Sequence, residues 1–183
     1  MPRLRRQAGG GRERSPVTPG TPRTKGLVSI TMTTATPPAG FIRLVVGYDG
    51  SPPANRALDA ATRLLQGRVG SIDVVYVAHL SSLVMMSPGA IAEMESDFDE
   101  VEQELRADAA EQLRASGAAW GFGRRQGIVA DELIAAATAI REAHADQTVV
   151  IVVGSSSHAS HRMVGSVAVS LARHSPVPLV IVP

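Results

Sequence analysis

Two short segments rich in glycine and serine hold the residues whose chemistry suggests a ligand site. The first is Asp49-Gly50-Ser51, which follows an apolar run. Its carboxylate could accept hydrogen bonds from a ribose or a base. The second segment begins at Gly154-Ser155-Ser156-Ser157 and ends at Gly165-Ser166. Small residues before a helix can present several backbone N–H groups, and with the helix dipole they favour a phosphate. Neither segment is specific alone, but together they make a nucleotide the leading hypothesis for the ligand.

Alternating strands and helices must position these two segments. Apolar runs predict strands at residues 41–48, 71–78, 120–126, 148–154 and 177–182, of which 120–126 is the weakest. Helical spacing predicts helices at residues 52–66, 90–116, 131–145 and 165–174. This order predicts an α/β fold with an open, doubly wound, five-stranded parallel sheet and helices on both faces. With 44% hydrophobic but only 3% aromatic residues, the core must consist of Val, Ile, Leu and Ala, which suits such a sheet.

The strand order decides whether the two segments can meet. In doubly wound sheets, ligands bind at the carboxyl ends of the strands, where the strand order reverses. If strands 41–48 and 148–154 are neighbours, the order is 3-2-1-4-5 and both segments border one crevice. We select this order from the chemistry of the turns, because periodicity cannot set it. The turn after strand 120–126 lacks comparable chemistry.

The first 40 residues differ in composition from the rest of the chain. They carry seven Arg or Lys and one Glu, whereas residues 41–183 carry 11 Arg and 16 acidic residues. Residues 1–40 are also rich in Gly, Pro, Ser and Thr without a hydrophobic period, so we predict a disordered basic tail. The natural start could be Met32, and only this tail offers a surface for nucleic acid. Residues 41–183 are predicted to form one mildly acidic domain, for which nucleic acid is an unlikely partner.

Composition excludes several classes of protein and site. The chain has no Cys, which excludes disulfides, thiol catalysis and cysteine zinc sites. No apolar run approaches the ~20 residues that span a bilayer, and the N-terminus lacks a secretory apolar region, so a cytoplasmic location is predicted. Lys25 is the only lysine, so the phosphate-binding lysine of a P-loop is missing. His158 and His161 lack a third ligand at suitable spacing, so no metal site is predicted. No nucleophile or general base stands out, so we expect no enzyme activity beyond very slow ATP hydrolysis.

Several stretches of this sequence resemble the universal stress protein family (UspA-like domain), over roughly residues 42–183. They are Val45–Ser51 with Ala57-Leu58, Val77-Ala78-His79, Val152–Ser156, Val164–Val167, Arg173-His174 and Pro176–Val182. The resemblance implies the adenine nucleotide alpha hydrolase-like fold with strand order 3-2-1-4-5. It also implies a homodimer formed through the last strand. The family divides into members that bind ATP and members that do not.

The loop after Gly154 departs from the pattern that the resemblance implies for ATP-binding members. That pattern is Gly, two residues, Gly, nine residues, Gly, then Ser or Thr. Here Ser157 stands at the second Gly, and only seven residues, His158–Val164, precede Gly165. If position 157 needs a positive φ, a Ser there costs roughly 1 kcal/mol or more. The shorter loop could bring His158, Ser160 or Arg162 toward the phosphates.

The resemblance therefore implies a small cytoplasmic stress-response regulator that binds an adenine nucleotide, such as ATP or AMP, with or without Mg²⁺. Asp49 would contact ribose or base, the backbone at Val77 and Ala78 would frame the adenine, and the remaining residues would hold ribose and phosphates. The candidate site residues are Asp49, Val77, Ala78, Gly154, Ser155, Ser157, Gly165, Ser166 and Val167. The alternative is a family member that binds no nucleotide and acts as a dimerising protein-interaction module. A third hypothesis, a nucleic-acid binder, depends only on the basic tail.

Overall fold

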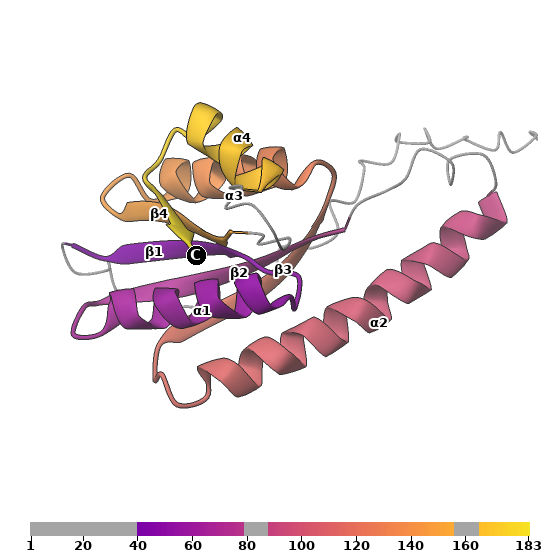
Figure 1. Ribbon diagram of the computed structural model, residues 1–183, viewed down its shortest axis with the longest axis horizontal. Coiled ribbons are helices and arrows are strands. Elements are labelled where there is room, and N and C mark those ends of the chain that lie inside the picture. Colours follow the sequence, from indigo (N-terminus) through magenta and orange to yellow (C-terminus); the bar gives the residue numbers. More distant parts are fainter. Residues whose placement is uncertain (1–39, 79–87, 156–164) are drawn as a thin grey trace, which may run out of the picture.

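The predicted α/β architecture is confirmed (Figure 1). The computed structural model describes residues 40–78, 88–155 and 165–183, with only the backbone at 88–96. Five strands form a parallel sheet in the order β3-β2-β1-β4-β5, as predicted. The elements are β1 (Ile42–Gly47), α1 (Pro52–Leu65), β2 (Gly70–Ala78), α2 (Pro88–Leu113), β3 (Ala119–Gln126), α3 (Val129–Ala143), β4 (Thr148–Gly154), α4 (Ser166–His174) and β5 (Leu179–Val182).

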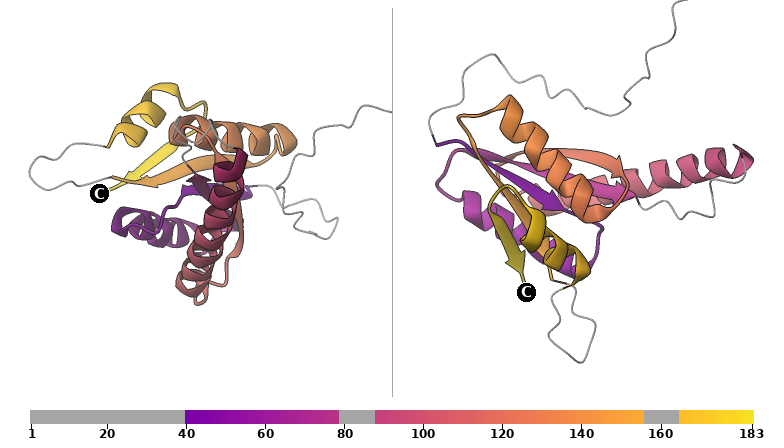
Figure 2. Two further views of the ribbon diagram at one scale, coloured as in Figure 1. Left: turned by 90° about the vertical axis from the view of Figure 1, so that its right-hand side faces the viewer. Right: turned by 90° about the horizontal axis from the view of Figure 1, so that it is seen from above.

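The helices form a layer on each face of the sheet, and each layer has its own core. α1 and α2 cover one face, whereas α3 and α4 cover the other (Figures 1 and 2). Alternate residues of β1 divide between the two cores: Leu44 and Val46 pack toward α1 and α2, and Val45 packs toward α3. Such period-2 division is expected of a strand buried on both faces. The aliphatic composition thus serves two separate cores, one on each face of the sheet.

Parallel register brings the carboxyl ends of β1, β2 and β4 to one edge of the sheet. Gly47 of β1 pairs with Val75 of β2, and Val46 of β1 pairs with Val152 of β4. β1 therefore lies between β2 and β4, and the helices that follow β1 and β4, α1 and α4, lie on opposite faces. This arrangement creates the crevice that parallel doubly wound sheets offer to ligands.

The start of α1 has residues that cap a helix N-terminus. Ser51 Oγ accepts a hydrogen bond from the Ala54 N–H at 3.4 Å, and Pro52 occupies the first helical position. Both features are typical of a helix N-terminus, because an Ncap oxygen satisfies a free N–H and proline lacks one. α1 then packs very closely against β4: a Cβ on Gly154 would lie 2.3 Å from the Pro53 carbonyl oxygen. Only glycine permits this approach of helix and strand beside the crevice.

The long helix α2 packs against the sheet mainly through its C-terminal half. Leu105, Ala109 and Leu113 are buried, whereas Val101 is 38% exposed. Figure 1 shows that the first turns of α2 extend beyond the sheet. This helix therefore meets the core only over part of its length. No helix among the described residues has both the length and the apolar character needed to cross a membrane.

Strand β3 is stronger than its sequence indicated, and α3 starts earlier than predicted. β3 pairs with β2 along all eight residues, and Phe122 packs into the α1/α2 core. Glycines at 121 and 123 weakened the apolar signal, but partner strand and helix supply the packing. α3 begins at Val129 rather than Asp131. Asp131 lies inside the first turn, where the helix dipole favours a carboxylate.

Candidate functional site

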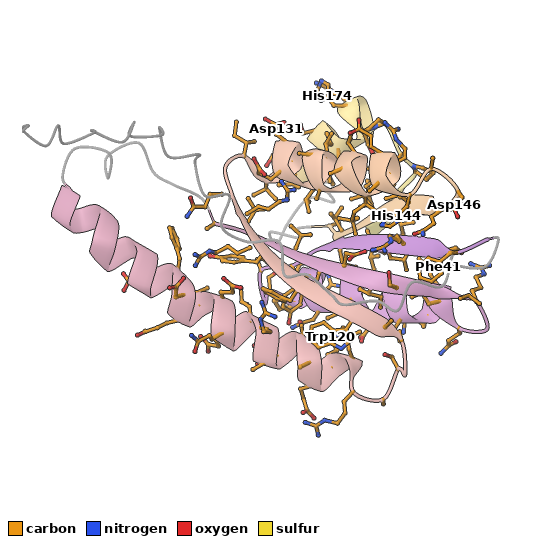
Figure 3. The ribbon with its side chains drawn as sticks, turned by 180° about the vertical axis from the view of Figure 1, so that it is seen from behind. Phe41, Trp120, Asp131, His144, Asp146 and His174 are labelled. Atoms are coloured by element: carbon orange, nitrogen blue, oxygen red, sulfur yellow. The ribbon has the colours of Figure 1, made fainter. Side chains whose placement is uncertain are left out.

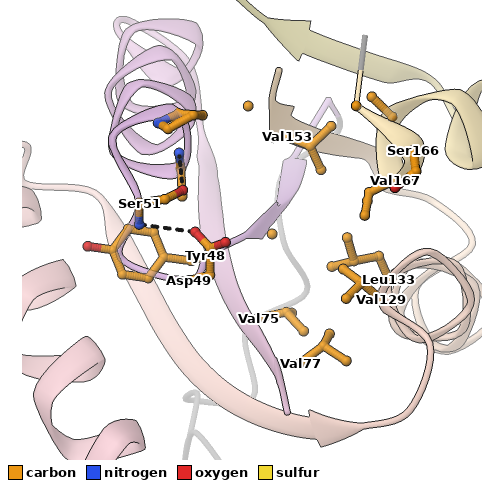
Figure 4. Close-up of a pocket in the computed structure, with 16 residues that line it drawn as sticks. Tyr48, Asp49, Ser51, Val75, Val77, Val129, Leu133, Val153, Ser166 and Val167 are labelled. Atoms are coloured by element: carbon orange, nitrogen blue, oxygen red, sulfur yellow. Dashed lines mark hydrogen bonds between the residues drawn. The ribbon is translucent and has the colours of Figure 1, made fainter. Parts of the chain in front are cut away.

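The turn after β1 forms one wall of a pocket at the carboxyl edge of the sheet. The Tyr48 N–H donates to the Val75 carbonyl at 2.9 Å, which extends the sheet one residue beyond β1. Gly50 then has φ +75°, a backbone conformation that favours glycine. The exposed Asp49 accepts a hydrogen bond from the Ser51 N–H at 3.0 Å through Oδ1 (Figure 4). This leaves the carboxylate with acceptor capacity for a ligand.

The opposite wall is formed by the end of β4 and the start of α4. Gly154, Gly165, Ser166 and Val167 line it. The Ncap of α4 is Gly165, and no side chain of the described residues caps the helix. The first N–H groups of a helix lack intrahelical partners, and they carry the positive end of its dipole. This wall can therefore bind an anion through backbone N–H groups.

Apolar side chains line the pocket between these two walls. Val75 and Val77 come from β2, Val129 and Leu133 from α3, and Val153 from β4 (Figure 4). Such a surface can bury the flat face of a base or the carbon atoms of a ribose, while the two polar walls fix the orientation. The pocket thus has an acceptor, an anion-binding helix end and an apolar surface within one cavity.

The sequence prediction missed the contribution of α3. The turn after β3 lacks polar chemistry, as expected, but Val129 and Leu133 bring apolar side chains into the pocket. The two residues are four apart and therefore share a helix face. Because the helix was predicted to begin at Asp131, Val129 was not assigned to a helix face with Leu133. Eight further lining residues were also not among the predicted site residues: Gly47, Tyr48, Ser51, Pro53, Ala54, Val75, Val153 and Ala168.

Six of the nine predicted site residues line the pocket. They are Asp49, Val77, Gly154, Gly165, Ser166 and Val167. Ala78 is fully buried beside Val77, and its side chain points away because successive strand residues alternate between faces. The Ser155 N–H donates to the Val182 carbonyl at 2.7 Å, so this group binds β5 instead. Ser157 lies outside the described residues, as do His79 and the loop residues His158, Ser160, His161 and Arg162.

The electrostatics of the pocket depend on Asp49 and the helix ends. Asp49 is the only charged side chain among the described residues that line it. Burial raises the pKa of the neighbouring Tyr48, and the negative charges of Asp108 and Asp49 raise it further. Tyr48 therefore remains a neutral hydrogen-bond donor. In the part of the chain that the structure describes, no three His, Asp or Glu side chains converge on a metal site.

A comparison of the sequence with models of protein families decides which family the chain belongs to. The model of the universal stress protein family matches residues 40–183. The chain belongs to the universal stress protein family. No curated protein sequence matches it significantly.

Solved structures of other universal stress proteins have the same fold. One from Burkholderia pseudomallei is 27% identical with a TM-score of 0.54, and the match covers 77% of this chain and 95% of that one. A universal stress protein described as being in complex with cAMP is 22% identical with a TM-score of 0.55, covering 77% and 96%. One from Arabidopsis thaliana, described with AMP bound, is 13% identical with a TM-score of 0.54, covering 77% and 90%.

Proposed function

We propose that this universal stress protein binds an adenine nucleotide in the pocket between the β1 turn and the start of α4. The observation that carries the proposal is the placement of two complementary polar walls across one apolar pocket. Asp49 supplies hydrogen-bond acceptors on one wall, and the helix N-terminus at Gly165 supplies donors on the other. A nucleotide needs donors for its phosphate, acceptors for its ribose hydroxyls and an apolar surface for its base.

The proposed roles follow from the position of each residue. Asp49 accepts hydrogen bonds from ribose or base, Val77 contacts the base, and the backbone from Gly165 to Val167 binds the phosphate. The two relatives described with cAMP and AMP support an adenine nucleotide as the ligand class. A single carboxylate among the described lining residues gives Mg²⁺ few protein ligands, so the cation would be bound mainly by the phosphates.

The role proposed for this pocket is regulatory rather than catalytic. The described lining residues offer a carboxylate, a neutral tyrosine and two serines, and both Tyr48 and Ser51 already take part in hydrogen bonds that hold the turn. A hydrolase needs a base positioned beside a nucleophile. We therefore propose a nucleotide-responsive protein of the cytoplasm, with one domain over residues 41–183, and with ATP turnover slow at most.

Calorimetry tests the proposed ligand. ATP, AMP and cyclic AMP are each titrated into the protein, with and without Mg²⁺. Binding of at least one should be abolished by Gly165→Asp, because the added carboxylate faces the phosphate. The control Ala172→Asp places the same charge at an exposed position of α4, away from the pocket. This variant should retain binding. Unchanged affinity in Gly165→Asp would refute the phosphate assignment. No heat at millimolar ligand would favour the alternative, a dimerising interaction module without a nucleotide.

We also propose that the protein forms a homodimer through β5. This strand lies at one edge of the sheet, and all four of its residues are only half-buried. An edge strand with Leu, Val and Ile side chains readily pairs with a second copy, because its outer N–H and C=O groups have no partner strand. Light scattering over a range of concentrations should give the dimer mass. A monomer at every concentration would contradict the proposal.

A further inference from the structure

The side chain of Asn55 contacts both residues that flank Asp49 in the chain. The Tyr48 hydroxyl donates to Asn55 Oδ1 at 2.8 Å, and Asn55 Nδ2 donates to the Gly50 carbonyl at 3.4 Å. Asn55 lies in the first turn of α1, where its N–H donates to the Ser51 carbonyl at 2.9 Å. Its backbone is therefore fixed by the helix. One carboxamide on a rigid helix thus binds both neighbours of the only charged residue among the described pocket-lining residues.

The β1 turn requires such support because little else holds the Asp49 carboxylate. Asp49 is exposed, and its one hydrogen bond within the described residues comes from the Ser51 N–H. An exposed hydrogen bond competes with water and holds a side chain weakly. Gly50 next to it has φ +75°, and glycine gives the chain more freedom than any other residue. Fixing Tyr48 and Gly50 therefore restricts Asp49 between them.

Helix α2 also contacts Asn55 and the β1 turn. The side-chain amide of Gln112 donates to the Asn55 carbonyl at 2.8 Å and to Asp59 Oδ1 at 2.7 Å. Leu105 fills the space beside Gly50 so closely that a Cβ there would lie 2.7 Å from Leu105 Cδ2. None of the described α2 residues lines the pocket. A shift of α2 would nevertheless move the groups that hold the turn.

We propose that Asn55 is a positioning residue, which holds Asp49 toward the ligand and links its position to α2. This inference rests on the proposed function for the role of Asp49 toward a nucleotide. The position needs an amide because it both accepts a hydrogen bond, from Tyr48, and donates one, to Gly50. An aspartate at 55 would still accept from Tyr48. It would lack the donor, however, and its charge would face the Gly50 carbonyl oxygen.

A double-mutant cycle tests whether Asn55 acts through Asp49. The affinity for AMP and cyclic AMP should fall about tenfold in Asn55→Asp, with no further loss when Asp49→Ala is already present. The matched control is Asp59→Asn, which changes a carboxylate one helical turn later that contacts Gln112 but neither Tyr48 nor Gly50. Its affinity should stay within about twofold of the wild type. An equal loss from Asn55→Asp in both backgrounds would overturn the proposal, because Asn55 would then act independently of Asp49.

A measurement without ligand separates this inference from the proposed function. Hydrogen exchange of the Ser51 amide reports whether its bond to Asp49 persists. In Asn55→Asp this amide should exchange about tenfold faster, while the amide of Leu58 in the next turns of α1 stays unchanged. If the wild type binds no nucleotide but this exchange rises, the proposed function fails and the positioning role stands. An unchanged Ser51 amide would overturn the positioning role, whatever the affinity.

The contribution of α2 is tested by the same measurement. Gln112→Ala removes the amide that contacts the Asn55 carbonyl and leaves both side-chain bonds of Asn55 in place. The Ser51 amide should exchange faster than in the wild type, by less than in Asn55→Asp. No change in its exchange would overturn the link between the turn and α2.

Discussion

The two ends of the parallel sheet use polar groups in opposite ways. At the carboxyl end, Asp49 is exposed and α4 has no side-chain cap from the described part of the chain, so acceptors and donors border an apolar pocket. At the amino end, Arg43 has a side chain only 12% exposed and donates to Gln147 Oε1 at 2.8 Å. Asp73 Oδ2 and His144 Nε2 each lie 3.5 Å from the same guanidinium. One end keeps polar groups available to a ligand, whereas the other pairs the charged Arg43 with neighbouring polar and charged side chains.

The amino-end cluster is held together by strand register. Arg43 of β1 lies beside Ser71 of β2 and Val149 of β4, so its guanidinium can reach Asp73 of β2 and Gln147, the residue before β4. Figure 3 shows Phe41 and His144 at this end of the sheet, and the Phe41 ring lies 5.9 Å from the guanidinium carbon. A buried charge is tolerated only when it is paired and hydrogen-bonded. We therefore expect this end to affect stability and the carboxyl end to affect binding.

The largest effect should come from removing the central charge of the amino end. Arg43→Met keeps the aliphatic stem but leaves Asp73 and Gln147 Oε1 without their partner. Breaking a buried charge pair typically costs about 3 kcal/mol, so the free energy of unfolding in urea should fall by about that amount. Arg63→Met, an exposed position on α1, should change it by less than about 0.5 kcal/mol. Weakened nucleotide binding in a folded Arg43→Met would contradict the separation of the two ends.

The reverse result is expected at the carboxyl end. Asp49→Ala removes the exposed acceptor of the pocket and should weaken nucleotide binding by about tenfold to a hundredfold, as a hydrogen bond to a charged group is worth ~1.5–3 kcal/mol. The free energy of unfolding should change by less than about 0.5 kcal/mol, because the lost bond to Ser51 is exposed. Calorimetry and urea unfolding of the same sample measure both. Full affinity would remove Asp49 from the site.

The sequence predicts best those features of the two sheet ends that depend on residues close together in the chain. The turn at Asp49-Gly50-Ser51 was predictable because capping and glycine preferences act within a few residues. The strand order could be inferred from the chemistry of two turns. The amino-end cluster was not predictable in this way. Arg43 and Asp73 lie next to buried residues in their strands and resemble ordinary polar interruptions, and the contacts of Arg43 with Asp73 and Gln147 exist only once β2, β1 and β4 are adjacent.

The pocket surface shows the same limit. Val77 was predicted from the family resemblance, and it lies near the end of β2, at the carboxyl edge where ligands bind in such sheets. Val129 and Leu133 enter the pocket because α3 begins beside the ends of β2 and β3, where the Gly127 N–H donates to the Ala78 carbonyl at 3.2 Å. This placement depends on a tertiary contact and on where the helix begins. Helix boundaries are the feature that a sequence predicts least well.

A smaller effect is expected from the apolar lining. Val129 is half-buried at the start of α3 and lines the pocket. Val129→Ala removes two methyl groups, each worth at most ~0.8 kcal/mol when fully buried, so affinity for AMP should fall about threefold. Val69→Ala is the matched control, because Val69 is 56% exposed at the amino end. A loss of affinity from Val69→Ala, or none from Val129→Ala, would argue against a base bound on this surface.

The smallest effect is a pH dependence confined to the amino end. Burial raises the pKa of Asp73, although the nearby charges of Arg43 and His144 oppose this rise. The folded state therefore binds a proton more readily than the unfolded chain, in which the pKa is near 3.8. Where the folded state holds more protons, stability falls as pH rises, so the contribution of Asp73 is present below pH 3.8 and is lost as pH rises through the folded pKa. Asp73→Asn cannot titrate. Its unfolding free energy relative to the wild type should therefore increase as pH rises through this window, while the pH dependence of nucleotide binding stays the same. A relative stability that moved in the opposite direction would show that the pairing with Arg43 outweighs burial at Asp73.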